Sequence, residues 1–194
     1  MTNKNLLRVG GISAFIGLAF TLADILFTGV TSPNAVPLAS KLLNSAAALS
    51  LIPFAYALYT LYRGQGPTLS KIGLAEVVLA AALFILCMVF LNLQPLALYN
   101  FAFTAIYIVP GLIFGILAYQ HPHPGMSRLL GVIGIASGLV GLVRFVILTL
   151  GGGDWTNLNN PALAPSIMVS YITWIVLGLI WWVWMGIALV RREA

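Results

Sequence analysis

The chain has 194 residues, of which 61% are apolar and 7% are charged, and its mean hydropathy is +1.04. Soluble domains carry about 25% charged residues, so this composition excludes a water-soluble protein. A membrane-spanning helix needs about 20 mostly apolar residues, and six such helices would use nearly the whole chain. The net charge of +5 comes from basic residues scattered along the sequence, which argues against a nucleic-acid-binding surface.

Six apolar segments are predicted to cross the membrane as one all-α bundle, a single transmembrane domain over residues 1–194. Each segment ends where Gly, Pro, Asn or Ser accumulate, as expected for helix ends. The first segment follows Lys4 and Arg8 as a signal peptide would, but it exceeds an apolar core of about 7–15 residues and contains Asp24. We therefore expect it to be retained. The predicted spans cover residues 9–30, 42–62, 72–93, 98–119, 129–150 and 167–190.

Basic residues lie near the span ends with a strong asymmetry. One side of the predicted bundle carries Lys41 alone. The other side carries Lys4, Arg8, Arg63, Lys71, Arg128, Arg191 and Arg192. Because cytoplasmic loops of membrane proteins are enriched in Lys and Arg, both termini are predicted to be cytoplasmic. We expect a multi-pass protein of a bacterial or archaeal cytoplasmic membrane.

A weak internal repeat has a period of about 60 residues. Three spans begin with a basic residue near a glycine: Arg8 with Gly10, Lys71 with Gly73, and Arg128 with Gly131. Two spans carry an asparagine and, about ten residues later, a proline: Asn44 with Pro53, and Asn100 with Pro110. Two interpretations stay open, namely three repeated helical hairpins or a pattern imposed by topology alone.

Ionisable residues occur inside three predicted spans: Asp24, Glu76 and Arg144. A charge at a span centre costs about 2.5–3.5 kcal/mol and usually faces protein or water. Asp24 follows Arg8, and Arg144 follows Arg128, by the same number of residues, so a rise of about 1.5 Å per residue places both at the same depth. Glu76 is close enough to Lys71 to reach the interface, and we expect its carboxylate either to extend there or to pair locally.

Small residues form a stripe on the first span and another on the fifth, and such stripes allow close helix packing. We predict that these two spans are neighbours and that Asp24 pairs with Arg144. The pair is interpreted either as a structural ion pair or as the charged floor of a cavity that opens outward. The candidate binding residues of that cavity are Asp24, Arg144, Asn44, Thr104, Tyr107 and Tyr171, with Ser170 beside them.

The last span is rich in tryptophan. Its deeper face, with Trp174 and Trp181, is a candidate ligand or partner face: it suits a bound lipid, quinone or carotenoid, although lipid contact or packing against another subunit is favoured. His121 and His123 lie in a loop that offers no Cys, Asp or Glu to complete a metal site. No metal or other cofactor is predicted.

Residues 123–138, HPGMSRLLGVIGIASG, combine a Pro-containing loop, an Arg and a Gly-rich span, and residues 180–192, IWWVWMGIALVRR, close the last span. In these segments the chain resembles small bacterial six-helix integral membrane proteins catalogued as a domain of unknown function. The resemblance implies a bacterial inner-membrane protein and transfers no functional residues.

No catalytic motif is present in the sequence, so we lean against an enzyme. The leading hypothesis is a scaffold or accessory subunit, partnered by the lipid bilayer and by other membrane subunits or further copies of itself. The alternative is a carrier or receptor for a small amphipathic or lipid-like molecule, bound by the polar cluster in the outer half of the bundle.

Overall fold

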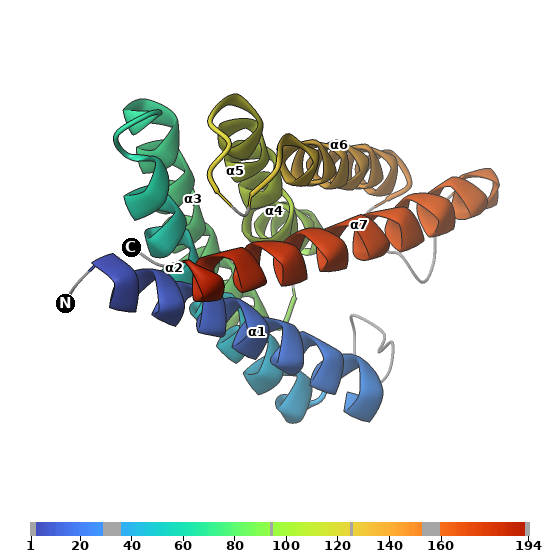
Figure 1. The fold of residues 1–194 in the computed structure, drawn as a ribbon. Helices are drawn as coiled ribbons and strands as arrows, with labels where there is room; N and C mark the ends of the chain where they lie inside the picture. Colours follow the sequence, from blue (N-terminus) through green and yellow to red (C-terminus); the bar gives the residue numbers. More distant parts are fainter. Residues whose placement is uncertain (1–2, 29–35, 94, 125, 153–159, 193–194) are drawn as a thin grey trace.

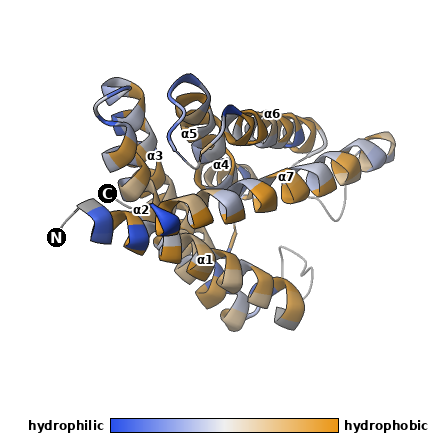
Figure 2. Cartoon of the chain, in the orientation of Figure 1, coloured by the Kyte–Doolittle hydropathy of each residue, from blue (hydrophilic) through white to orange (hydrophobic). Residues whose placement is uncertain are grey.

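The structure is a computed structural model that describes residues 3–28, 36–93, 95–124, 126–152 and 160–192, and regular structure in these ranges is helical (Figure 1). Six helical spans within them are long and apolar enough to cross a membrane. Figure 2 shows hydrophobic residues along the length of these helices. The elements are α1 (Asn3–Thr28), α2 (Leu38–Tyr62), α3 (Pro67–Ile85), η1 (Leu86–Phe90), α4 (Leu96–Tyr107), α5 (Val109–Gln120), α6 (Arg128–Leu150), η2 (Pro161–Leu163) and α7 (Ala164–Arg191).

The predicted spans are confirmed as six apolar helical segments, with one difference inside the fourth. Residues 29 and 30 of the first predicted span lie outside the described residues. That span is two helices, because α4 ends at Tyr107 and α5 begins at Val109. Pro110 explains the break, since proline lacks an N–H group and its ring clashes with the carbonyl four residues earlier. Pro53 lies inside α2, which stays continuous, so the two halves of the proposed repeat differ at this point.

The third span also ends irregularly. Its last turn, η1, is a π-helix in which the Leu91 N–H group donates to the Leu86 carbonyl five residues earlier. Asn92 and Leu93 then adopt positive φ angles of 50° and 64°, a region that residues other than glycine rarely occupy. The Leu93 N–H group donates to the Cys87 carbonyl at 2.8 Å, and this return of the chain buries the Leu93 side chain in the protein.

The helices pack in an order that corrects one expectation. Helix α1 packs on α2 and α7, whereas α6 packs on α5 and α7. Figure 1 shows α7 running between α1 and α6. The prediction that the first and fifth spans form a direct interface was therefore wrong.

Each small-residue stripe serves the adjacent hairpin partner instead. On α1, a Cβ atom added to Gly10 would meet Ala57 and the Pro53 carbonyl of α2. On α6, a Cβ atom added to Gly131 would collide with the Tyr119 backbone and lie 2.8 Å from the Gly115 carbonyl of α5. The stripes did predict close packing, but sequence spacing does not say which helix fills the groove.

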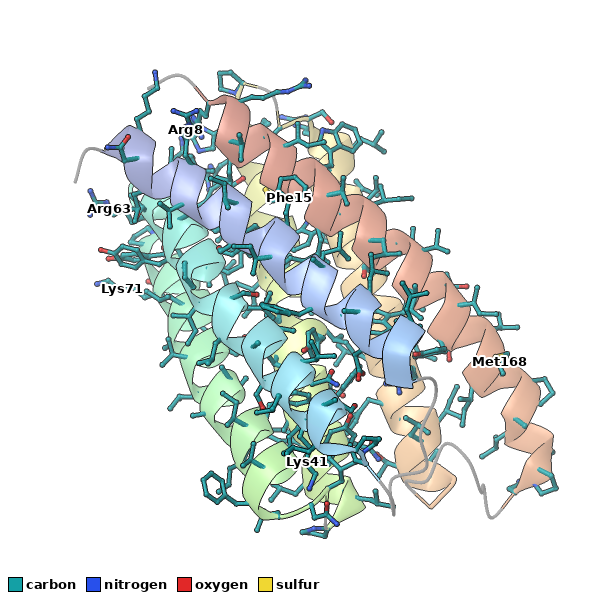
Figure 3. All side chains as sticks on the ribbon, turned by 90° about the horizontal axis from the view of Figure 1, so that it is seen from below. Arg8, Phe15, Lys41, Arg63, Lys71 and Met168 are labelled. Atoms are coloured by element: carbon teal, nitrogen blue, oxygen red, sulfur yellow. The ribbon has the colours of Figure 1, made fainter. Side chains whose placement is uncertain are left out.

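Basic residues gather at one end of the bundle, and Lys41 lies at the other (Figure 3). Figure 3 shows Arg8, Arg63 and Lys71 toward one end and Lys41 and Met168 toward the other. We call the first of these the basic end and the second the Lys41 end. Helix α1 begins, and α7 finishes, at the basic end (Figure 1).

The close contact between α5 and α6 predicts that a methyl group added at Gly131 lowers the stability of the protein. Gly131→Ala should push the two backbones apart and destabilise the protein by about 1–3 kcal/mol, the usual cost of overpacking. Gly64→Ala is the matched control, because a Cβ atom there has nothing within 4 Å. Thermal unfolding in mild detergent should show a lower Tm for the Gly131 variant alone; equal melting of both variants would contradict the packing.

Candidate binding cavity

Helices α1 and α7 cross closely near the basic end. A Cβ atom on Gly11 would lie 2.7 Å from the Gly186 carbonyl, and one on Gly186 would lie 3.1 Å from the Phe15 ring. Only glycine allows backbones to approach this closely. Away from this crossing the two helices diverge (Figure 1). A cavity lies between them.

The cavity has a volume of about 550 Å³ and lies toward the Lys41 end. Its lining is mainly apolar, with polar groups contributed by five helices. The apolar part includes Leu18 and Ile25 of α1 and Ile167 and Met168 of α7. The polar and aromatic lining residues are Thr21, Asp24, Ser40, Asn44, Tyr99, Phe103, Tyr107, Arg144, Tyr171 and Trp174.

Asp24 reaches the cavity from α1 and is held by α2. The Asn44 Nδ2 group donates to Asp24 Oδ2 at 2.7 Å and also to the Ser40 carbonyl at 2.9 Å. Ser40 and Asn44 are one helical turn apart, so the amide is oriented by its own helix. A carboxylate that accepts a hydrogen bond is less costly inside a membrane than an isolated one.

Arg144 enters the cavity from α6 and is only 7% exposed. Its Cζ atom lies 5.1 Å from the Phe103 ring centroid, 5.2 Å from that of Tyr171 and 5.8 Å from that of Trp174. Such cation–π contacts are worth about 2 kcal/mol or more when the cation is desolvated. The Nε atom of Arg144 is buried and has no hydrogen-bond partner among the described residues. The aromatic rings thus stabilise the charge but leave a donor unused.

Asp24 and Arg144 both line this cavity. Tyr99 lies within electrostatic range of both side chains. The two charges come from helices on opposite sides of α7, so the cavity brings them together without an α1–α6 interface. Their direct ion pair stays a prediction.

The structure divides the other predicted residues into two groups. Tyr107, Tyr171 and Trp174 line the cavity beside Asn44. Thr104 does not: it is buried, and its hydroxyl donates to the Asn100 carbonyl at 2.7 Å. Ser170 likewise donates to its own helix, at the Ile167 carbonyl. A serine or threonine hydroxyl on a helix can donate its hydrogen bond to a backbone carbonyl of the preceding turn. The sequence alone does not show whether a given hydroxyl does so or faces a cavity.

The tryptophan face is also divided. Trp181 is 1% exposed and meets the Phe54 ring edge-on at 5.9 Å between centroids. It belongs to the protein's own core, so the expectation that Trp181 faces a ligand, lipid or partner was wrong. Trp174 contacts Phe103 and lines the cavity.

Sequence analysis missed several lining residues. Tyr99 and Phe103 are the clearest, because together with Tyr107 they recur every fourth residue on one face of α4. This i, i+4 pattern places side chains along a single helix face and was a usable signal. Met88 and Leu93 lacked one, since their position depends on the π-helical turn.

Glu76 lies outside the cavity. Both carboxyl oxygens are buried and have no hydrogen-bond partner among the described residues. The expectation that this side chain extends to the interface was therefore wrong. A charged carboxylate in such surroundings is costly.

At the basic end, His123 joins the loop after α5 to the end of α7. The Arg192 Nη2 group lies 3.0 Å from His123 Nδ1, and because arginine only donates, Nδ1 must be the acceptor. The Tyr62 ring packs on the imidazole with centroids 5.2 Å apart. Burial and then the charge of Arg192 lower the pKa of His123.

No cluster of three or more metal-ligating side chains occurs in the part of the chain that the structure describes.

Acid is expected to weaken the contact between His123 and Arg192. Because the pKa of His123 is lower in the folded protein, the unfolded chain binds the proton more readily, and stability present above a pH of about 6.5 is lost below it. The Tm in detergent should fall between about pH 7.5 and about pH 5.5. His123→Gln should reduce that fall, whereas His121→Gln should keep it; an unchanged pH dependence in His123→Gln would contradict the assignment.

Comparison of the chain with protein-family models, with curated proteins and with solved structures finds no match. Function is therefore inferred from the residues themselves. The feature with the most chemical content is the cavity between α1 and α7, where a carboxylate, a guanidinium and several aromatic rings meet an apolar wall.

Proposed function

We propose that this membrane protein binds a small amphipathic molecule, as its carrier or receptor, in the cavity between α1 and α7. The observation that supports this proposal is the lining, which combines a polar wall at Asp24 and Arg144 with an apolar wall between the helices. A volume of about 550 Å³ lies within the range of about 300–1,000 Å³ found for small-molecule pockets. Such a lining suits a molecule with a polar head and a hydrocarbon tail.

The cavity rim supports entry from the bilayer. Leu22 and Ile25 on α1 are 42% and 47% exposed, and Met168 on α7 is 59% exposed, although all three line the cavity. In a membrane these side chains face lipid. An amphipathic molecule that diffuses in the bilayer would pass between the diverging helices without leaving an apolar environment.

The scaffold hypothesis loses part of its basis. It drew on an aromatic last helix available to a partner, yet Trp181 lies in the core and Trp174 lines the cavity. The absence of catalytic motifs agrees equally well with a binding protein. Binding is therefore the better-supported function, and association with other subunits remains compatible with it.

We infer that the protein lies in a bacterial cytoplasmic membrane with its basic end in the cytoplasm. The charge asymmetry between the two ends supports this orientation. The resemblance of residues 123–138 and 180–192 to bacterial membrane proteins favours a bacterial membrane. The cavity would then lie in the outer half of the membrane.

Cysteine accessibility tests the orientation. Cys87 is buried and can be replaced by alanine, after which Ala162→Cys and Gln65→Cys place single thiols at exposed positions of the Lys41 end and the basic end. A membrane-impermeant maleimide added to intact cells should label position 162 and should label position 65 only after permeabilisation. The reverse pattern would overturn the orientation.

Obstruction of the cavity tests the function. Leu18→Trp adds bulk to the lining, whereas Ile16→Trp adds the same bulk two residues away on an exposed face of α1. Amphiphiles that copurify in mild detergent should be extracted and counted by mass spectrometry per protein molecule. We expect a near-stoichiometric species in the wild type and in Ile16→Trp, reduced at least about tenfold in Leu18→Trp, which corresponds to about 1.4 kcal/mol. Equal retention in both variants would refute binding in the cavity.

A further inference from the structure

We propose that the head group recognised in the cavity is an anion, a carboxylate or phosphate, bound by Arg144. This inference rests on the proposed function and specifies its ligand class. The ligand would be an amphiphile with one anionic head, such as a fatty acid or an alkyl phosphate, whose tail lies between α1 and α7.

The first reason is the incomplete coordination of Arg144. The side chain is 93% buried, as follows from its exposure of 7%. Phe103, Tyr171 and Trp174 attract its charge, but their ring faces do not replace an acceptor at Nε, which has no partner among the described residues. A buried donor without an acceptor is costly, so an incoming acceptor is favoured.

The second reason is the geometry of a guanidinium group. Its N–H groups form a rigid planar fork whose adjacent donors match the two oxygens of a carboxylate or phosphate. The aromatic contacts restrict the position of the Arg144 guanidinium. A group held in advance loses less conformational freedom when a ligand binds.

The third reason is the asymmetry between the two charges of the cavity. Asp24 already accepts a hydrogen bond from Asn44 at 2.7 Å, so the protein supplies a donor to its own carboxylate. Among the described residues Arg144 contacts the rings of Phe103, Tyr171 and Trp174, and its Nε group has no acceptor there. A negatively charged acceptor would satisfy this Nε donor, so the cavity favours an anionic over a cationic head group.

The apolar lining specifies the rest of the molecule. Leu18 and Ile25 of α1 and Ile167 and Met168 of α7 all line the same cavity. A small inorganic anion would leave this part of the cavity unfilled. A hydrocarbon tail would cover it, because apolar surfaces favour apolar contacts.

The test uses the full-length protein in phosphatidylcholine bilayers with two spin-labelled probes. One is stearic acid with a nitroxide near its methyl end, in its ionised form, and the other is its methyl ester. Electron paramagnetic resonance measures the motionally restricted fraction of each probe. We expect the acid to associate about tenfold more strongly than the ester, and Arg144→Gln to lower the acid to the level of the ester without changing the ester.

Two further variants keep the outcomes separate. Leu18→Trp should reduce the restricted fraction of both probes, while Ile16→Trp should change neither. If Leu18→Trp changes neither probe, the proposed cavity function fails; if it reduces both while the wild type binds acid and ester equally, only the anion inference fails. If Arg144→Gln does not fold, the comparison of acid and ester on the wild type decides alone.

Competition identifies the source of the anion. Laurate and dodecyl phosphate should displace the spin-labelled acid, and the stronger competitor identifies the preferred head. Inorganic phosphate at the same concentration should displace none. Equal displacement by inorganic phosphate would overturn the inference, because the site would then bind a water-borne anion rather than an amphiphile.

Discussion

The close crossing of α1 and α7 at Gly11 and Gly186 determines where the bundle opens into a cavity. Two straight helices that touch at one point and cross at an angle must separate away from it. Near the basic end the Gly11 and Gly186 backbones leave no space between them. Toward the Lys41 end the separation is filled by a cavity of about 550 Å³. The glycines at the crossing therefore also determine the opening at the other end, because two helices that touch at one end and cross at an angle separate toward the other.

The same geometry explains how two opposite charges are accommodated inside an apolar bundle. Asp24 lies on a helix tightly bound to α2, which supplies Asn44 as its donor. Arg144 lies on a helix bound to α5, and receives its rings from α4 and α7. Asp24 is thus held from α2, and Arg144 from α4 and α7. Both side chains line the cavity, so a ligand placed there would act on both.

Much of the architecture could be predicted because the bilayer limits it so strongly. Six apolar segments and the equal depth of Asp24 and Arg144 follow from composition and helix rise alone. The choice of helix neighbours could not be predicted, because a glycine stripe packs equally well against any small surface. The stripe that contains Gly131 packs on α5 and not on α1. The fate of Thr104 and Trp181 was likewise hidden, since rotation of a helix by part of a turn decides whether a residue lines a cavity or fills a core.

The irregular backbone of the protein also gathers at this cavity. Tyr107 is the last residue of α4 before the break caused by Pro110, and Leu93 follows the π-helical turn with a positive φ of 64°. Both line the cavity. Because unpaired backbone groups are not tolerated against lipid, non-helical segments within a membrane occur where protein or a cavity surrounds them. The π-helical turn and the broken span are therefore parts of the cavity wall, because each brings a side chain, Leu93 or Tyr107, into the cavity lining.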